Sequence, residues 1–297
     1  MPLVRTSSEF STMKQRAITA VFFVAAMLAG VFGGPIPFFL LFGFVAAGAG
    51  WELITLCSDR SDPWFWYRRA KGTGLAVLPF LISAWWHSIS VLPEWWTRLT
   101  QMSPMAVPAL LAVSIFLLLL MELALHPKRP FDEAGYYFLA LFYVGLPLAL
   151  LIDVAFTRGG YVPMKVMGIL FLNWMNDTFA YLTGSMIGKT PLAPRISPKK
   201  TWEGTLGGIF FTILLAWGIA RLSPVFSTAE WLVIAACVSV FGTMGDLVES
   251  MLKRSVGVKD SGNILPGHGG ILDRFDSFIF LLPFVWLALT LIHLFSS

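Results

Sequence analysis

The sequence predicts an all-α, polytopic integral membrane protein, and its composition and hydropathy carry that prediction. Apolar residues make up 57% of the 297 residues and charged residues only 13%, whereas soluble domains contain about 45–50% apolar and about 25% charged residues. The mean hydropathy is +0.74. A chain with so little charge cannot cover its own surface in water, so we expect much of that surface to face lipid.

Nine segments approach the length of about 20 mostly apolar residues that a transmembrane helix needs. They are residues 16–32, 38–57, 72–89, 105–125, 135–152, 164–187, 204–220, 231–252 and 275–295. The linkers are too short for a soluble domain, so we expect residues 1–297 to form a single transmembrane helical domain. Eight further spans follow the first, which favours a retained span over a cleaved signal peptide. The pairs Gly30/Gly34 and Gly204/Gly208 predict close helix packing.

The distribution of basic residues predicts the orientation of the chain. All but four of the 21 Lys and Arg residues fall on one side when the spans are threaded in order; the exceptions are Arg98, Arg158, Lys165 and Arg221. Cytoplasmic loops carry the excess of such residues, so we expect a cytoplasmic N-terminus. In a membrane protein these side chains attract anionic headgroups or phosphates, so the net charge of +4 does not indicate nucleic acid as a partner.

Carboxylates inside spans are costly and therefore mark candidate functional residues. Five are found, at Glu52, Glu122, Asp177, Asp246 and Glu249. Glu52 and Glu122 lie near span ends, so the favoured interpretation is that their long side chains reach water. Asp177 lies deep in a span beside Asn173 and Asn176, which predicts a polar pocket facing the interior of the bundle.

Four acids form two pairs, Asp246/Glu249 and Asp273/Asp276. The members of each pair are three residues apart, so each pair is expected to face one direction on a helix. Between them lies the most polar stretch of the chain, with Lys253, Arg254, Lys259, Asp260, His268 and the glycines of residues 267–270. Mg²⁺ prefers one or two carboxylates plus phosphate oxygens, while Lys and Arg neutralise phosphate charge. This pattern favours a metal–phosphate site. The alternative is a solvated cytoplasmic loop in which Asp273 is a helix N-cap.

Two segments before residue 205 also resemble phosphate-binding elements. Residues 184–190 look like a P-loop, but only three residues separate the glycines where that motif needs four, and a helix precedes them, so we reject the assignment. Residues 197–204 form a basic turn that contains Ser197, Lys199, Lys200 and Thr201. Taken alone, this turn is best interpreted as a membrane-edge anchor with Thr201 as N-cap. The alternative is phosphate contact at a helix N-terminus.

Taken together, these segments resemble the phosphatidate cytidylyltransferase (CDP-diacylglycerol synthase) family. The long signature of that family is matched without a gap over residues 250–276, from Ser-x-Leu-Lys-Arg through Lys-Asp-Ser-Gly and Pro-Gly-His-Gly-Gly to Asp-Arg-Phe-Asp. Residues 197–204 and 245–250 are also similar, which places the catalytic signature within residues 173–277. The first five spans are similar only in hydropathy and placement.

The resemblance implies an Mg²⁺-dependent nucleotidyltransferase that converts CTP and phosphatidic acid to CDP-diacylglycerol and pyrophosphate. Its binuclear metal centre would include a monovalent cation such as K⁺. Asp246 and Asp273 match the metal ligands, and we expect Glu249 and Asp276 to complete or support that shell. Catalytic cations would be Lys253, Arg254 and Lys259; substrate-binding residues would be Ser197, Lys199, Lys200, Thr201, Asp177, Asp260, His268, Gly269, Gly270 and Arg274.

This interpretation predicts an enzyme of the cell inner membrane whose active site faces the cytoplasm, where cytosolic CTP meets phosphatidic acid in the bilayer; a homodimer is compatible with it. One alternative is a CTP-dependent polyprenol or dolichol kinase-like enzyme, which transfers the terminal phosphoryl group instead. A second is a cation or metabolite transporter with Asp177, Asp246 and Glu249 along its pathway. Transporter sites lie near the midplane, whereas most polar residues here collect at one face.

Overall fold

The computed structural model describes residues 7–88, 113, 120, 130–157, 160–264 and 269–296. The predicted span 105–125 therefore lies outside the described residues except for Val113 and Leu120, as do Glu122 and His268. The helices are α1 (Ser7–Phe32), α2 (Pro35–Cys57), α3 (Phe65–Ser88), α6 (Pro130–Leu139), α7 (Leu146–Ala155), α8 (Pro163–Ile187), α9 (Trp202–Leu222), α10 (Thr228–Cys237), α11 (Thr243–Ser255) and α12 (Leu272–Ser296). The predominance of helix confirms the predicted class.

Five helical runs among the described residues are long and apolar enough to cross a membrane. They are Pro35–Cys57, Ala134–Ala155, Trp202–Leu222, Thr228–Ser255 and Leu272–Phe295. These runs support an integral membrane protein. Helix α8 covers its predicted range but is not among the five; it carries Asn173, Asn176 and Asp177.

Two of these runs contain a π-helical turn that the hydropathy pattern does not predict. The turn η1 (Ala140–Gly145) joins α6 to α7, and η2 (Val238–Gly242) joins α10 to α11. A π-turn inserts an extra residue into a helix and is frequent at functional sites. Here η2 directly precedes the helix that carries Asp246, and so helps to set the direction in which this side chain projects.

Two short antiparallel hairpins were not predicted. Strands β1 (Phe156–Thr157) and β2 (Gly160–Tyr161) form one. Strands β3 (Pro191–Ala193) and β4 (Ser197–Thr201) form the other, which leads directly into α9. Prolines in residues 191–198 cannot donate the hydrogen bonds of a continuing helix, so α8 ends before them. The basic turn expected over residues 197–204 is thus a short strand followed by a helix.

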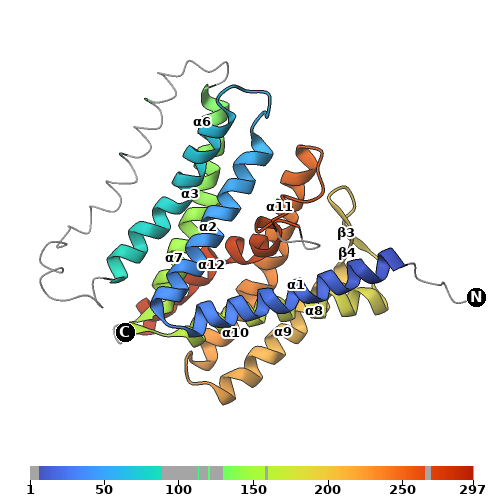
Figure 1. Ribbon diagram of the computed structural model, residues 1–297. Coiled ribbons are helices and arrows are strands. Elements are labelled where there is room, and N and C mark those ends of the chain that lie inside the picture. The colour runs from blue at the N-terminus through green and yellow to red at the C-terminus, as the bar shows by residue number, and fades with distance from the viewer. Residues whose placement is uncertain are drawn as a thin grey trace, which may run out of the picture.

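Helix α12 lies at the centre of the molecule. It packs against α2 and α7 on one side and against α10, η2 and α11 on the other, while α1 runs across α8 (Figure 1). Phe42 of α2 and Phe275 and Phe278 of α12 are buried together where the two groups of helices meet. The beginning of α12 is thereby held between both groups of helices.

The two predicted glycine pairs have different outcomes. A methyl group added at Gly204 would meet the Ala180 carbonyl oxygen at 2.7 Å, and one at Gly208 would meet the Ala180 Cβ at 3.0 Å, so α9 packs closely on α8 as predicted. Gly30 packs on Leu41 in the same way, but a methyl group added at Gly34 would meet no atom within 4 Å. Gly34 instead has a φ of 105° in the turn between α1 and α2, a conformation that favours glycine.

Replacing Gly204 by Ala is expected to lower the free energy of unfolding by about 1–3 kcal/mol, because the new methyl group meets backbone that cannot move aside. Gly218 of the same helix has open space around it. The matched Gly218→Ala change should therefore be neutral or stabilise by about 0.5–1 kcal/mol. Denaturant unfolding in mixed micelles measures both; equal effects of the two changes would contradict the close α8–α9 packing.

Candidate active site

A cavity of about 880 Å³ opens where α8, the β4–α9 junction, α11 and the beginning of α12 converge. Most of the polar residues singled out from the sequence line it. These are Asp177, Lys199, Lys200, Thr201, Asp246, Lys253, Asp260, Asp273, Arg274 and Asp276. Asp177 and Asn173 line this cavity together with acids of residues 246–276, whereas Asn176 is buried outside the lining.

The other predicted site residues that the structure describes lie outside this lining. Ser197, Gly269 and Gly270 are close in the chain to lining residues, whereas Arg254 and Lys259 are exposed to solvent. The Arg254 guanidinium donates a hydrogen bond to the Val258 carbonyl at 2.8 Å. The structure thus does not bring Arg254 and Lys259 to the cavity.

Asp246 and Glu249 differ in their depth of burial, which their spacing on the helix does not predict. Asp246 lines the cavity, where Oδ2 lies 2.5 Å from the Lys200 Nζ and Oδ1 accepts a hydrogen bond from Ser250. Glu249 is completely buried. It lies four residues after Gly245, which packs directly on the α12 backbone, so the helix surface that carries Glu249 is turned inward.

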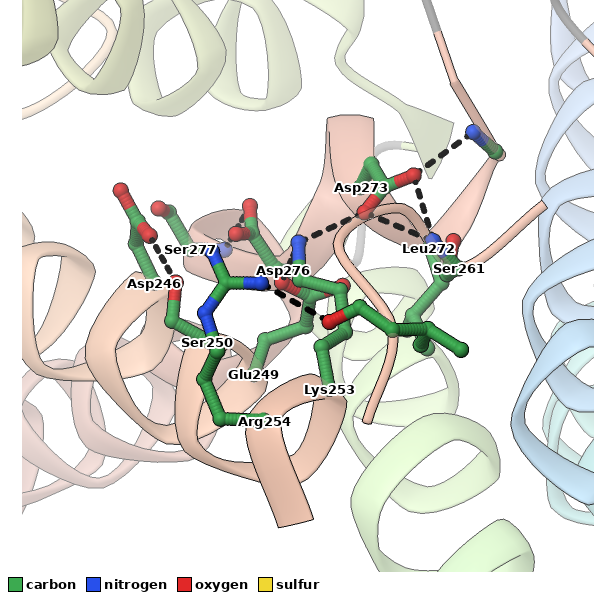
Figure 2. Close-up of polar contacts among 12 residues, drawn as sticks. Asp246, Glu249, Ser250, Lys253, Arg254, Ser261, Leu272, Asp273, Asp276 and Ser277 are labelled. Atoms are coloured by element: carbon green, nitrogen blue, oxygen red, sulfur yellow. Dashed lines mark hydrogen bonds and ion pairs between the residues drawn. The ribbon is translucent and has the colours of Figure 1, made fainter. Parts of the chain in front are cut away.

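Lys253 forms ion pairs both with the buried Glu249 and with Asp273 of the cavity lining. Its ammonium group forms ion pairs with Glu249 Oε2 and with Asp273 Oδ1, the latter at 2.7 Å (Figure 2). Glu249 Oε1 has no hydrogen-bond partner within the described part of the chain. An isolated carboxylate in such surroundings would cost several kcal/mol, so Lys253 is the cation that makes the burial of Glu249 tolerable.

Asp273 organises the loop that precedes α12. It lies in the first turn of that helix rather than at the N-cap position. Its Oδ2 accepts hydrogen bonds from the backbone N–H groups of Gly270 at 2.7 Å and Ser261 at 2.9 Å, while Oδ1 accepts from Lys253. Asp273 is therefore not the N-cap of the alternative interpretation; it holds the loop and lines the cavity.

Three carboxylates form an acidic cluster at the cavity, namely Asp177, Asp246 and Asp276. The charges of Asp177 and Asp246 both act on Asp276, whose Oδ1 accepts a hydrogen bond from the Ser277 N–H. Within the described residues, no three His, Cys, Asp or Glu side chains are close enough to hold a metal ion by themselves. The carboxylates that line the cavity, Asp246 and Asp273 among them, fit Mg²⁺, which commonly takes one or two carboxylates and completes its shell with water and substrate phosphate.

Basic residues line the same cavity as the acidic cluster. Lys199 and Lys200 lie on β4, and Thr201 caps α9 by accepting a hydrogen bond from the Gly204 N–H at 3.1 Å, as predicted. The N–H groups of Lys189 and Thr190 both donate to the Glu203 carboxylate. They are therefore occupied by an anion of the protein, which agrees with the rejection of a P-loop over residues 184–190.

Several residues of the site carry no signal that the sequence analysis recognised. Helix α1 contributes Thr19, Ala20, Phe23 and Val24 to the lining.

The expectation that Glu52 reaches water is wrong, because only 3% of this residue is exposed. Its carboxylate accepts a hydrogen bond from Ser261 Oγ, in the loop between α11 and α12 that we call the signature loop. It accepts another from the N–H of Leu272, where α12 begins. The available signal was the carboxylate itself, within an otherwise apolar span.

The fold and the cavity define a helical membrane protein with facing carboxylates and lysines, a combination suited to a divalent cation and phosphates. The chain belongs to the cytidylyltransferase family, whose sequence profile matches residues 14–292. It is 38% identical over 283 residues to a phosphatidate cytidylyltransferase of Bacillus subtilis (strain 168), covering 94% of this chain and 98% of that protein. It is 40% identical over 212 residues to one of Staphylococcus aureus (strain COL), covering 69% and 77%. The resemblance inferred from residues 250–276 is confirmed, and the chain is a nucleotidyltransferase.

Proposed function

We propose that this protein transfers the cytidylyl group of CTP to phosphatidic acid, forming CDP-diacylglycerol and pyrophosphate. The observation that carries the proposal is the cavity in which Lys200 and Lys253 lie beside Asp246 and Asp273, on the segments that match the family signature. Relatives named phosphatidate cytidylyltransferase, similar over most of their length, support the same substrates.

The chemistry needs charge neutralisation more than a general base. The second pKa of a phosphate monoester is about 6, so phosphatidic acid is mostly a dianion at neutral pH. One of its phosphate oxygens forms a bond to the α-phosphorus of CTP, and the bond from that phosphorus to the bridging oxygen of the β-phosphate breaks. Pyrophosphate leaves with the electron pair of that bond. The main obstacle is the repulsion between two anions, which cations in the site reduce.

We assign the residues of the cavity to this task. Asp246 and Asp273 would hold Mg²⁺, Asp276 of the same cavity would support that shell, and a monovalent cation such as K⁺ would be the second ion. The metal would supply positive charge at the phosphate oxygens of CTP.

Protein cations would neutralise the remaining charge. Lys199, Lys200, Lys253 and Arg274 reach the cavity and would bind the phosphates of CTP or of the lipid. Glu249 would act indirectly, by holding Lys253 in place. Arg254 and Lys259 are exposed outside the lining, so we assign them only the attraction of nucleotide from solution.

We further propose that the chain crosses the inner membrane nine times, with its N-terminus and active site on the cytoplasmic side. The five apolar runs and the asymmetry of the basic residues support this topology. The polar cavity lies beside Lys199 and Lys200, within a loop assigned to the cytoplasm, where CTP is available.

Purified protein in detergent with CTP, phosphatidic acid and Mg²⁺ is expected to yield CDP-diacylglycerol and an equal amount of pyrophosphate. EDTA should stop the reaction, and excess Mg²⁺ should restore it, because the paired carboxylates cannot neutralise phosphate without a cation. Diacylglycerol, which has no phosphate nucleophile, is the matched control and should give no product. Failure to form any nucleotide–lipid product from an acidic phospholipid would overturn the assignment.

A further inference from the structure

Glu52 connects the N-terminal helices to the signature loop. It lies on α2, more than 200 residues from its partners in the chain, and is not among the residues that line the cavity. Its Oε2 accepts hydrogen bonds from Ser261 Oγ at 3.0 Å and from the Leu272 N–H at 2.8 Å. Since Leu272 begins α12, this carboxylate satisfies a free N–H of the first turn and lies at the positive end of the helix.

The glycines of the loop provide independent support for this contact. A methyl group added at Gly262 would lie 2.3 Å from Glu52 Oε1, and one added at Gly270 would lie 2.3 Å from Oε2. The backbone thus approaches the carboxylate from both ends of the loop, as closely as only glycine permits. The two glycines and Glu52 form one packed unit.

Ser261 transmits this contact to the site. Its hydroxyl donates to Glu52, and its backbone N–H donates to Asp273 at 2.9 Å. Asp273 in turn holds the Lys253 ammonium group. Only Ser261 therefore separates the buried glutamate of α2 from Asp273, and Asp273 contacts Lys253; both of these residues line the cavity.

We propose that Glu52 is a positioning residue for cytidylyl transfer, which sets the place of Asp273 and Lys253 by fixing the signature loop at Ser261 and Leu272. The inference rests on the proposed function for its readout. A group that orients a catalytic residue from behind typically contributes about 10–100-fold to activity. Because Glu52 does not line the cavity, its loss should lower kcat and leave the KM for phosphatidic acid unchanged.

Three variants test the proposal in the CDP-diacylglycerol assay, with kcat expressed per folded protein. Glu52→Ala removes the acceptor and is expected to lower kcat about 10–100-fold. Glu52→Gln keeps a carbonyl oxygen that can accept both hydrogen bonds, so kcat should stay within about threefold of the wild-type value. Ser261→Ala removes only the hydroxyl, and an intermediate loss is expected.

Glu230→Ala is the matched control. Glu230 is also a largely buried carboxylate at the start of a helix, where it forms a capping box with Ser227, but it lies outside the cavity lining. Its loss should lower thermal stability and leave kcat unchanged. A wild-type kcat in folded Glu52→Ala would overturn the inference. If Glu52→Ala does not fold, a wild-type kcat in Ser261→Ala would overturn it. Absence of product from the wild-type protein would instead refute the proposed function.

Discussion

The substitution Asp246→Asn is expected to lower kcat by about 10²–10³-fold, a loss of the size seen when one preorganised electrostatic group of an active site is removed. Asp246 lines the cavity beside Lys200, and an amide has the same shape but lacks the charge that holds a cation. A higher Mg²⁺ concentration should also be needed for half-maximal activity. Titration of Mg²⁺ with the purified variant measures both effects.

Asp59→Asn serves as the control for this experiment. Asp59 is an exposed carboxylate in the loop after α2, and its hydrogen bonds go to Ser61 of the same loop. Its replacement should change neither kcat nor the Mg²⁺ dependence. An Asp246→Asn protein with normal turnover at low Mg²⁺ would contradict the metal assignment, whatever the behaviour of the control.

Lys253→Met is expected to have the largest effect on stability. It leaves Glu249 buried without its cation, and breaking a buried ion pair in this way costs about 3–5 kcal/mol. The same change removes a positive charge from the cavity, so kcat should fall about 10²-fold even at temperatures where the variant is folded. Unfolding in mixed micelles measures the loss of stability. Kinetics at a temperature where the variant is folded measure the loss of kcat.

The double variant Lys253→Met with Glu249→Gln tells the structural contribution from the catalytic one. Removing both charges leaves no uncompensated ion, so most of the lost stability should return. Activity should remain low, because the cation that faces the phosphates is still missing. Full recovery of activity together with stability would show that Lys253 acts only as the partner of Glu249.

The sequence predicts the helical class and most span positions, because lipid exposure imposes a composition that can be recognised locally. It also predicts the charged residues of the cavity lining. Asp273 and Asp276 belong to the signature over residues 250–276, and Asp246 lies in the segment directly before it. Asp177 carries the local signal of a carboxylate among amides in a span. In each case the relevant information lies within a few turns of the residue itself.

What could not be predicted depends on packing between distant segments. The direction of Glu249 follows from the close approach of Gly245 to α12, and the burial of Glu52 follows from a loop more than 200 residues away. The π-turn η2 and the β3–β4 hairpin carry no distinct hydropathy pattern. Spacing on an ideal helix predicts a shared face for both acids of α11 but not that Asp246 lines the cavity while Glu249 is fully buried.

The destination of the two radiolabels of CTP tests the central claim most directly. Purified protein receives phosphatidic acid and Mg²⁺ with CTP labelled in either the α- or the γ-phosphate, and the lipid and aqueous phases are separated. We expect the α-label to enter the lipid and the γ-label to appear only in pyrophosphate. Transfer of the γ-label to lipid would identify a CTP-dependent kinase, and retention of both labels in unreacted CTP would contradict cytidylyl transfer altogether.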